Sequence, residues 1–157
     1  MTNDVCAVAR SLTKRHDTSD PFAIAKSLNI HVLYEDLGTI RGYYNTAYRS
    51  RFIHINRDLS PDEQLMVCAH ELGHAVLHKN SNTCFYLNHT CFSVSKLEWE
   101  ANCFMTMLLY SDDELLELSD CSLDQLESIL GLPLPLIRWR FDQIKEKETL
   151  LKWDSVS

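Results

Sequence analysis

The sequence contains no apolar run close to the length of about 18 residues that a membrane-spanning helix requires, and it is poor in basic residues. Its 157 residues include 15 Lys or Arg against 22 Asp or Glu, which gives a formal net charge of −7. Binding to a nucleic-acid backbone requires a basic face. We therefore expect no membrane partner and no direct nucleic-acid partner, whereas an acidic surface suits docking onto a basic protein.

The first residues, 1–6, lack the basic and then apolar segments of a signal peptide. We therefore expect a cytoplasmic protein whose six cysteines are reduced thiols rather than disulfides. Cys68 and Cys103 fall on predicted helices and are expected in the core. A metal site at Cys84 and Cys91 is an alternative, but their spacing is unusual for zinc, so structural thiols are favoured.

The sequence has no internal repeat and no low-complexity linker. Its length fits one domain with a proper core, and we predict a single domain over 1–157. Within it, 1–56 would form a helical lead-in and a small sheet. Residues 57–110 would form the central helices, and 111–157 the C-terminal helices.

Apolar periodicity and end signals predict most of the secondary structure. Three capping boxes begin at Ser60, Ser111 and Ser122, and Gly131 follows the helix that the third one opens. The order of elements predicts an α+β fold with a small antiparallel sheet beside the helix that follows Ser60. The predicted helices are 3–15, 21–28, 61–78, 97–109, one from 112, 123–130 and 133–147; the strands are 30–34, 40–46 and 51–55, and 79–95 is a loop.

Residues 70–74 read His-Glu-Leu-Gly-His, the HExxH pattern, inside a predicted helix. On a helix, His70 and His74 are one turn apart on one face and can share a tetrahedral Zn²⁺ ion. Glu71 would lie beside the metal without binding it, where it can take a proton from water. The pattern arises by chance in roughly 2% of chains of this composition, so the argument needs a third ligand.

The residues near the motif offer several candidates for this ligand. His78 is unsuitable, because eight residues of helix advance the chain by about 12 Å, too far from His70 for two bonds near 2 Å to one ion. Glu98 and Asn102 share a helix face, so that Glu98 can bind the ion and Asn102 can accept the N–H of a ligating imidazole. Glu100 is rotated from Glu98 by about 200°, so Glu98 is favoured and Glu100 is expected to be a solvated surface acid or a salt-bridge partner.

With this second motif, the chain resembles the ImmA/IrrE family of gluzincin-like metallopeptidases of bacteria, phages and mobile elements. The resemblance rests on His-Glu-Leu-Gly-His-Ala-Val-Leu-His at 70–78, on Glu-Trp-Glu-Ala-Asn-Cys-Phe at 98–104 and on the Leu-Leu pair at 108–109. The sequence departs from the family pattern at Met105 and Tyr110, which changes packing and substrate fit rather than the metal motif.

The resemblance implies a helical, zincin-like domain in which the helices of 57–110 bind one zinc ion. Carried over by position, His70, His74 and Glu98 would be the metal ligands, Glu71 the catalytic acid and base, and Asn102 the group that orients a ligand. These donors suit zinc best, although other divalent ions could occupy the same set.

The resemblance also implies a zinc-dependent endopeptidase that makes limited, site-specific cuts in a protein substrate. Members of the family act on helix-turn-helix repressors of mobile elements or stress responses. The alternative is a zinc-containing anti-repressor that sequesters such a DNA-binding repressor without cleaving it. The presence of Glu71 argues against the alternative, because a structural zinc site does not need this residue and would usually have a fourth protein ligand.

The strand that precedes the metal motif is a candidate for substrate binding. If 51–56 is an exposed sheet edge, it could hold an extended peptide by β-augmentation, with Phe52, His54 and Asn56 on one face. The hairpin also contains candidates for an oxyanion stabiliser, although packing is the favoured role of each. These candidates are Tyr43, Tyr44, Tyr48 and His54.

Overall fold

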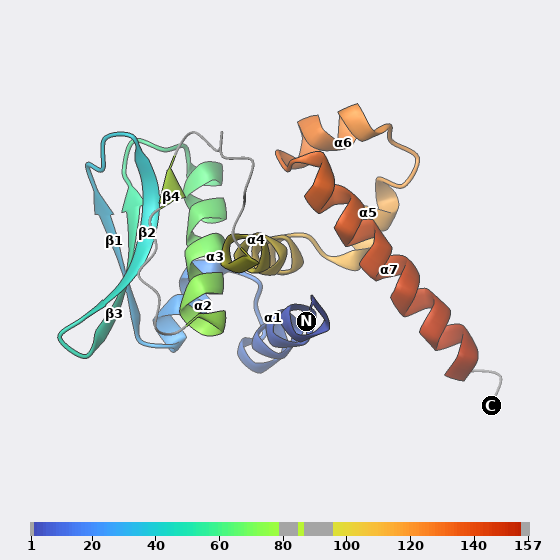
Figure 1. The fold of residues 1–157 in the computed structure, drawn as a ribbon, viewed down its shortest axis with the longest axis horizontal. Helices are drawn as coiled ribbons and strands as arrows, with labels where there is room; N and C mark the ends of the chain where they lie inside the picture. The colour runs from blue at the N-terminus through green and yellow to red at the C-terminus, as the bar shows by residue number, and fades with distance from the viewer. Residues whose placement is uncertain (1, 79–84, 87–95, 155–157) are drawn as a thin grey trace. The chain divides into compact units, whose positions relative to one another are not determined.

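The computed structural model describes the backbone of residues 2–78, 85–86 and 96–154 (Figure 1). The chain is built from two compact units, Met1–Leu109 and Tyr110–Ser157. The first unit contains α1 (Thr2–His16), α2 (Pro21–Ser27), β1 (Ile30–Glu35), β2 (Ile40–Ala47), β3 (Ser50–Asn56), α3 (Pro61–Leu77), β4 (Phe85–Tyr86) and α4 (Lys96–Leu109). The second contains α5 (Asp112–Glu117), α6 (Leu123–Leu130) and α7 (Leu134–Asp154). The predicted α+β fold is confirmed, and the single domain over 1–157 stays a prediction.

The helix ends follow from local capping. The predicted capping boxes are present at the starts of α3, α5 and α6. At α3, the Ser60 hydroxyl accepts the Glu63 N–H at 3.3 Å, and the Glu63 carboxylate accepts the Ser60 N–H at 3.0 Å. The Ser60 N–H and the Ser60 hydroxyl both donate to the Glu63 carboxylate, and these two bonds lower the pKa of Glu63. Gly131 ends α6 with a φ of 63°, a left-handed conformation that costs glycine little.

The sheet has the order β1-β3-β2-β4 and is mixed, not antiparallel as predicted. β2 and β3 form the predicted antiparallel hairpin, and β4 is antiparallel to β2. β1, however, lies parallel to β3. The chain reverses direction after β1 and again after β2, so β3 returns between the two earlier strands in the direction of β1. A local pattern of residues cannot reveal this insertion, because it depends on pairing between strands that are not neighbours in the sequence.

One face of the sheet packs on α3 and α2 (Figure 1). Tyr44, Ile53 and Ile55 are fully buried there. Gly42 belongs to the same face, since it pairs with Ile55. A Cβ atom at Gly42 would lie 2.5 Å from Cγ1 of Val67 on α3, so glycine allows the helix to approach the sheet closely.

The opposite side of α3 packs against α4, and α1 also packs against α4. A Cβ atom at Gly73 would lie 3.1 Å from Cδ1 of Phe104 and 3.2 Å from Cα of Ala101. The small residue therefore sets a short distance between α3 and α4. Cys68 and Cys103 are fully buried on these two helices, as predicted, and burial raises the pKa of the Cys103 thiol to about 12.

In the second unit, Arg140 on α7 is buried and donates a hydrogen bond to the carbonyl of Tyr110 at 3.0 Å. It also forms an ion pair with Asp112, whose other oxygen lies 2.6 Å from Nζ of Lys147. Burial raises the pKa of Asp112, but the hydrogen bonds from Lys147 and Arg140 outweigh this effect and leave the pKa below its ordinary value. α7 extends beyond the predicted end at residue 147.

A helix that crosses a bilayer must be both long and apolar. None in the described part of the chain combines the length and the apolar character that crossing a bilayer requires.

Candidate metal centre

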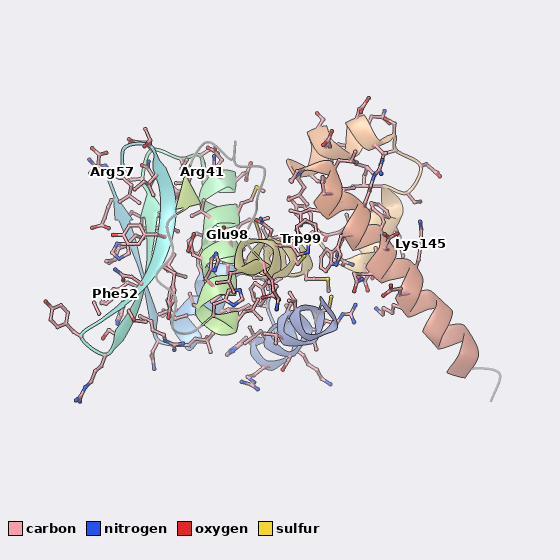
Figure 2. All side chains as sticks on the ribbon, viewed as in Figure 1. Arg41, Phe52, Arg57, Glu98, Trp99 and Lys145 are labelled. Carbon is pink, nitrogen blue, oxygen red and sulfur yellow. The ribbon has the colours of Figure 1, made fainter. Side chains whose placement is uncertain are left out.

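Three potential metal ligands converge where α3 faces α4. Nε2 of His70 lies 3.1 Å from Nε2 of His74. The two oxygens of Glu98, on the first turn of α4, lie 3.3 Å from these nitrogens, Oε2 from His70 and Oε1 from His74. Figure 2 shows Glu98 on the side of α4 that faces α3. Among the described residues, this is the group of His, Cys, Asp or Glu side chains with the geometry to hold a metal ion.

The spacing of the three side chains fits a single ion. Tetrahedral coordination with bonds of about 2.0–2.2 Å places neighbouring ligand atoms about 3.3–3.6 Å apart. The two imidazole nitrogens are 3.1 Å apart and each is 3.3 Å from one oxygen of Glu98, close to this value, and one ligand atom from each residue lies within 4.8 Å of the others. Two imidazoles and one carboxylate leave a fourth position for water or substrate, which is the composition of a catalytic rather than a structural zinc site.

Asn102 orients one of the imidazoles. Its Oδ1 lies 2.9 Å from Nδ1 of His70, one helical turn along α4 from Glu98. Because an amide oxygen only accepts, Nδ1 of His70 carries the hydrogen and Nε2 presents its lone pair toward His74 and Glu98. The structure thus places Asn102 where the sequence predicts it, behind a candidate ligand.

The electrostatics of the group favour a bound cation. His70, His74 and Glu71 have no exposed surface, while one third of the Glu98 side chain is exposed. Burial raises the pKa of Glu98, but hydrogen bonds and charge from His70 and His74 outweigh burial and hold the pKa well below its ordinary value. The buried carboxyl group of Glu71 is costly to ionise without nearby positive charge. A divalent cation at the adjacent ligands would supply that charge.

A second cluster, also of His and Glu, lies farther along the same two helices. Nε2 of His78 is 3.2 Å from the carbonyl of Leu97 and 3.6 Å from Oε2 of Glu100. Nζ of Lys96 lies 3.6 Å from the other oxygen of Glu100. Glu100 thus takes part in ion pairs and His78 caps a carbonyl, as expected for residues outside the metal group. Burial lowers the pKa of His78, and the charge of His74 lowers it further.

The predicted binding of a peptide along 51–56 is wrong. β3 is an inner strand, paired with β1 on one side and with β2 on the other, so its backbone groups are already used. Asn56 is also occupied, because its amide group donates to the carbonyls of Gly38 and Ile40, both at 3.0 Å, and accepts the N–H of Asp58. These bonds tie the β1–β2 connection to β3, and we no longer expect Asn56 to contact a substrate.

Successive side chains of a strand point to opposite faces of the sheet. Ile53 and Ile55 face α3, so Phe52 and His54 lie on the face turned away from this helix. Figure 2 shows Phe52 on that side. Nδ1 of His54 contacts the Glu35 carboxylate, and its ring stacks on Tyr43 with the ring centres 4.2 Å apart. The sheet therefore separates Phe52 and His54 from the metal group, which corrects their predicted contact with a substrate there.

The positions of the four candidates for oxyanion stabilisation do not suit that role either. Tyr43 and His54 are on the far face, Tyr44 is buried in the core, and Tyr48 is fully exposed in the turn between β2 and β3. Packing, the favoured role, agrees with the positions of Tyr43, Tyr44 and His54. The predicted loop 79–95, with Cys84 and Cys91, lies outside the described residues apart from β4.

Sequence reasoning missed Gly73. The residue is part of the HExxH segment, but the pattern itself leaves this position open. Its role becomes visible only when α4 is in place, since the contact it permits is with Ala101 and Phe104. A small residue between two candidate ligands on a helix is the signal that could have indicated a close helix pair.

One helix carries two imidazoles and a buried glutamate, and it faces a carboxylate on a second helix. This arrangement points to the class of metallopeptidases. The chain belongs to the family of the IrrE N-terminal-like domain (Peptidase_M78), whose model matches residues 25–142. The resemblance to ImmA/IrrE proteins is therefore confirmed, and the protein is a metallopeptidase.

Two relatives support this assignment. The chain is 38% identical over 133 residues to an immunity region protein, number 2, of Bacillus phage phi105, covering 83% of this chain and 84% of the relative. It is 32% identical over 141 residues to the metallopeptidase ImmA of Bacillus subtilis (strain 168), covering 86% of this chain and 82% of that protein. No solved structure matches the chain significantly.

Proposed function

We propose that the protein is a zinc-dependent endopeptidase that makes limited, site-specific cuts in one protein substrate. The observation that carries the proposal is the convergence of His70, His74 and Glu98 beside a buried Glu71, with the two imidazole nitrogens 3.1 Å apart and each 3.3 Å from one oxygen of Glu98. One zinc ion is the metal that best suits two imidazoles and a carboxylate with an open position.

Each protein group has a distinct part in the proposed reaction. Zinc, when bound, supplies the Lewis acidity that activates water and polarises the scissile carbonyl. Glu71 takes the proton from the attacking water and passes it to the leaving amine. Asn102 holds the Nδ1–H of His70, so that this imidazole keeps its Nε2 lone pair for the ion. Gly73 permits α4 to bring Glu98 and Asn102 close to α3.

For the substrate, we propose a helix-turn-helix repressor that the protein meets in the cytoplasm. The description of the phage phi105 relative as an immunity region protein supports a substrate from a phage immunity system. A DNA-binding repressor carries a basic surface, and this chain has a net charge of −7, so the two proteins attract each other.

The test is a cleavage assay with the repressor encoded beside the gene, co-expressed with wild type, Glu71→Gln or Glu100→Gln. Glu71→Gln removes the proposed base, whereas Glu100→Gln makes the same chemical change outside the metal group. We expect wild type and Glu100→Gln to shorten the repressor, and Glu71→Gln to leave it intact with cleavage reduced by roughly 10²–10⁴-fold.

A second readout in the same cells separates cleavage from sequestration. A reporter controlled by the repressor should be derepressed only by the variants that cut. If Glu71→Gln derepresses the reporter while the repressor stays intact, and wild type also leaves it intact, the protein acts as an anti-repressor by binding and the proposal fails.

A further inference from the structure

The outer edge of the sheet, formed by β1, is unusually open. The order β1-β3-β2-β4 makes β1 a terminal strand, and no other strand in the described residues pairs with its free side. Soluble proteins usually protect such an edge with proline, lysine, a bulge or a very short strand. β1 spans Ile30–Glu35 in regular register with β3 and contains neither proline nor lysine.

The backbone groups that face this open side can be assigned. The carbonyl of Glu35 accepts the N–H of Arg57 at 2.9 Å, which continues the pairing with β3. In a strand, the N–H and C=O groups of alternate residues point to opposite sides. The backbone groups of Leu33 therefore point toward β3, as those of Glu35 do. The backbone groups of Val32 and Tyr34 point to the open edge.

The side chains of β1 offer apolar surface beside these backbone groups. Leu33 is 38% exposed and Tyr34 is 51% exposed, although both are large and hydrophobic. A groove of about 390 Å³ lies between α2 and the first half of the strand. It is lined by Phe22, Lys26, Asn29, Ile30, His31 and Val32.

We propose that β1 pairs antiparallel with β1 of a second copy of this chain, across a two-fold axis at Leu33. The two sheets would then join edge to edge into one continuous sheet. In this register Leu33 lies opposite Leu33 of the second copy, Val32 opposite its Tyr34, and His31 opposite its Glu35. The inference is independent of the proposed peptidase function.

The hydrogen-bonding pattern agrees with the register. A two-fold axis perpendicular to the sheet keeps like faces together, so residues that lie opposite each other must have the same parity. Val32 and Tyr34 both turn their backbone groups outward, and as opposite residues they can exchange a pair of N–H···O bonds. Leu33 then forms the non-hydrogen-bonded pair on the axis, where side chains approach most closely.

The charges select this register over its neighbour. With the axis at Leu33, the His31 imidazole meets the Glu35 carboxylate of the second copy twice, and no like charges are opposed. Glu35 uses Oε2 for His54, and a carboxylate has a second oxygen that can accept a bond. With the axis at Val32, His31 would instead meet Leu33, and Glu35 would lie beyond the paired strand.

The groove provides a place for the exposed tyrosine. Tyr34 of the second copy lies opposite Val32, which lines the groove together with Phe22. Within one chain, Phe22 and Tyr34 already stack with ring centres 6.5 Å apart. The pairing would therefore bury both exposed tyrosine rings against a surface that the molecule already uses for aromatic contact.

The first experiment measures the molar mass of the full chain by sedimentation over a concentration series. We expect wild type to be in a monomer–dimer equilibrium. Leu33→Lys places two like charges on the axis and should weaken dimerisation by roughly tenfold or more. The matched control is Leu116→Lys on α5, where the leucine is 41% exposed, and this variant should dimerise as wild type does.

His31 provides a test of the charges. His31→Glu opposes two pairs of carboxylates and should weaken the dimer, whereas His31→Lys should keep it. Circular dichroism shows whether each variant is folded. The proposal is overturned if folded wild type stays monomeric at every concentration, or if Leu33→Lys dimerises as strongly as wild type.

A cysteine at the axis tests the register itself. Opposite residues in a non-hydrogen-bonded pair have Cα atoms about 4.5 Å apart, within the range of a disulfide. Under mild oxidation, Leu33→Cys should form a covalent dimer, while wild type, with its native cysteines, and Val32→Cys should not. A cross-link through Val32→Cys instead, or through neither variant, would contradict the proposed pairing.

Discussion

Two clusters of histidine and glutamate lie along the same pair of helices, yet only one has the geometry of a metal site. In the first, Nε2 of His70 and Nε2 of His74 lie 3.1 Å apart, and each lies 3.3 Å from one oxygen of Glu98. In the second, His78 bonds to the Leu97 carbonyl, and its contact with Glu100 is longer, at 3.6 Å. The residue types are the same, so the difference lies in where their donor atoms point.

The surroundings of the two clusters explain this difference. The first lies where Gly73 allows α4 to approach α3, and Asn102 fixes the orientation of an imidazole. The second lies at the C-terminal end of α3, where His78 is already outside the helix as its cap residue. A metal site therefore requires a close helix pair and an orienting partner, in addition to suitable side chains.

The largest expected effect comes from removing His74 of the first cluster, and removal of His78 from the second cluster is the matched control. His74→Ala deletes a proposed ligand and should lower zinc affinity by more than about 100-fold, beyond the 10–100-fold typical of orienting partners. His78→Ala should keep the zinc content of wild type. The measurement is the zinc-to-protein ratio after dialysis against a chelator. Equal loss in the two variants would show that both clusters bind metal.

Asn102 should give the next largest effect. Asn102→Leu removes the acceptor of the His70 N–H and should reduce zinc affinity by roughly 10–100-fold. Asn102→Asp keeps an acceptor oxygen at the same place and should retain most of the affinity. Competition with a fluorescent chelator measures both constants. If Asn102→Leu binds zinc as wild type does, then the hydrogen bond has no orienting role.

Gly73→Ala tests the close approach of the helices. The added Cβ would lie 3.1–3.3 Å from atoms of Phe104 and Ala101, two of which belong to the backbone. Alanine favours a helix by about 0.5–1 kcal/mol over glycine, but overpacking costs about 1–3 kcal/mol, so we expect a net loss of stability. Urea unfolding and the zinc-to-protein ratio should both decline. A variant with higher stability and full zinc content would show that α4 can shift without cost.

The smallest effect concerns the pH response of the second cluster. Burial, followed by the charge of His74, lowers the pKa of His78 in the folded state below its ordinary value of 6.5. The unfolded chain therefore binds the proton more readily, and stability falls as the pH falls through about 6.5. His78→Gln should reduce the loss of unfolding free energy between pH 7 and pH 5 by less than about 1 kcal/mol. An unchanged slope would mean that His78 is not involved.

The local parts of the molecule could be predicted from the sequence. The capping boxes at Ser60, Ser111 and Ser122 place three helix starts, because their hydrogen bonds join residues three apart. The HExxH helix and the Glu98–Asn102 turn also follow from spacing within single helices. The expectation that these two turns face each other came from the resemblance to a family, and they do so in the structure.

The parts that depend on distant pairing could not be predicted. Nothing in 51–56 indicates that β1 lies on its far side, and this neighbour is what prevents β3 from acting as an edge. The role of Asn56 is hidden for the same reason, since its amide bonds to the carbonyls of Gly38 and Ile40 on another segment. Polar residues on a strand can serve the fold as readily as a substrate.

The uneven burial of the three candidate ligands also has a kinetic consequence. Both imidazoles are closed off from water, and the Glu98 side chain is one third exposed. Among the described ligands, Glu98 is the one open to solvent, so an ion would enter or leave on the side of its carboxylate. We therefore expect the rate at which the metal exchanges with solvent to depend on Glu98 more than on either imidazole.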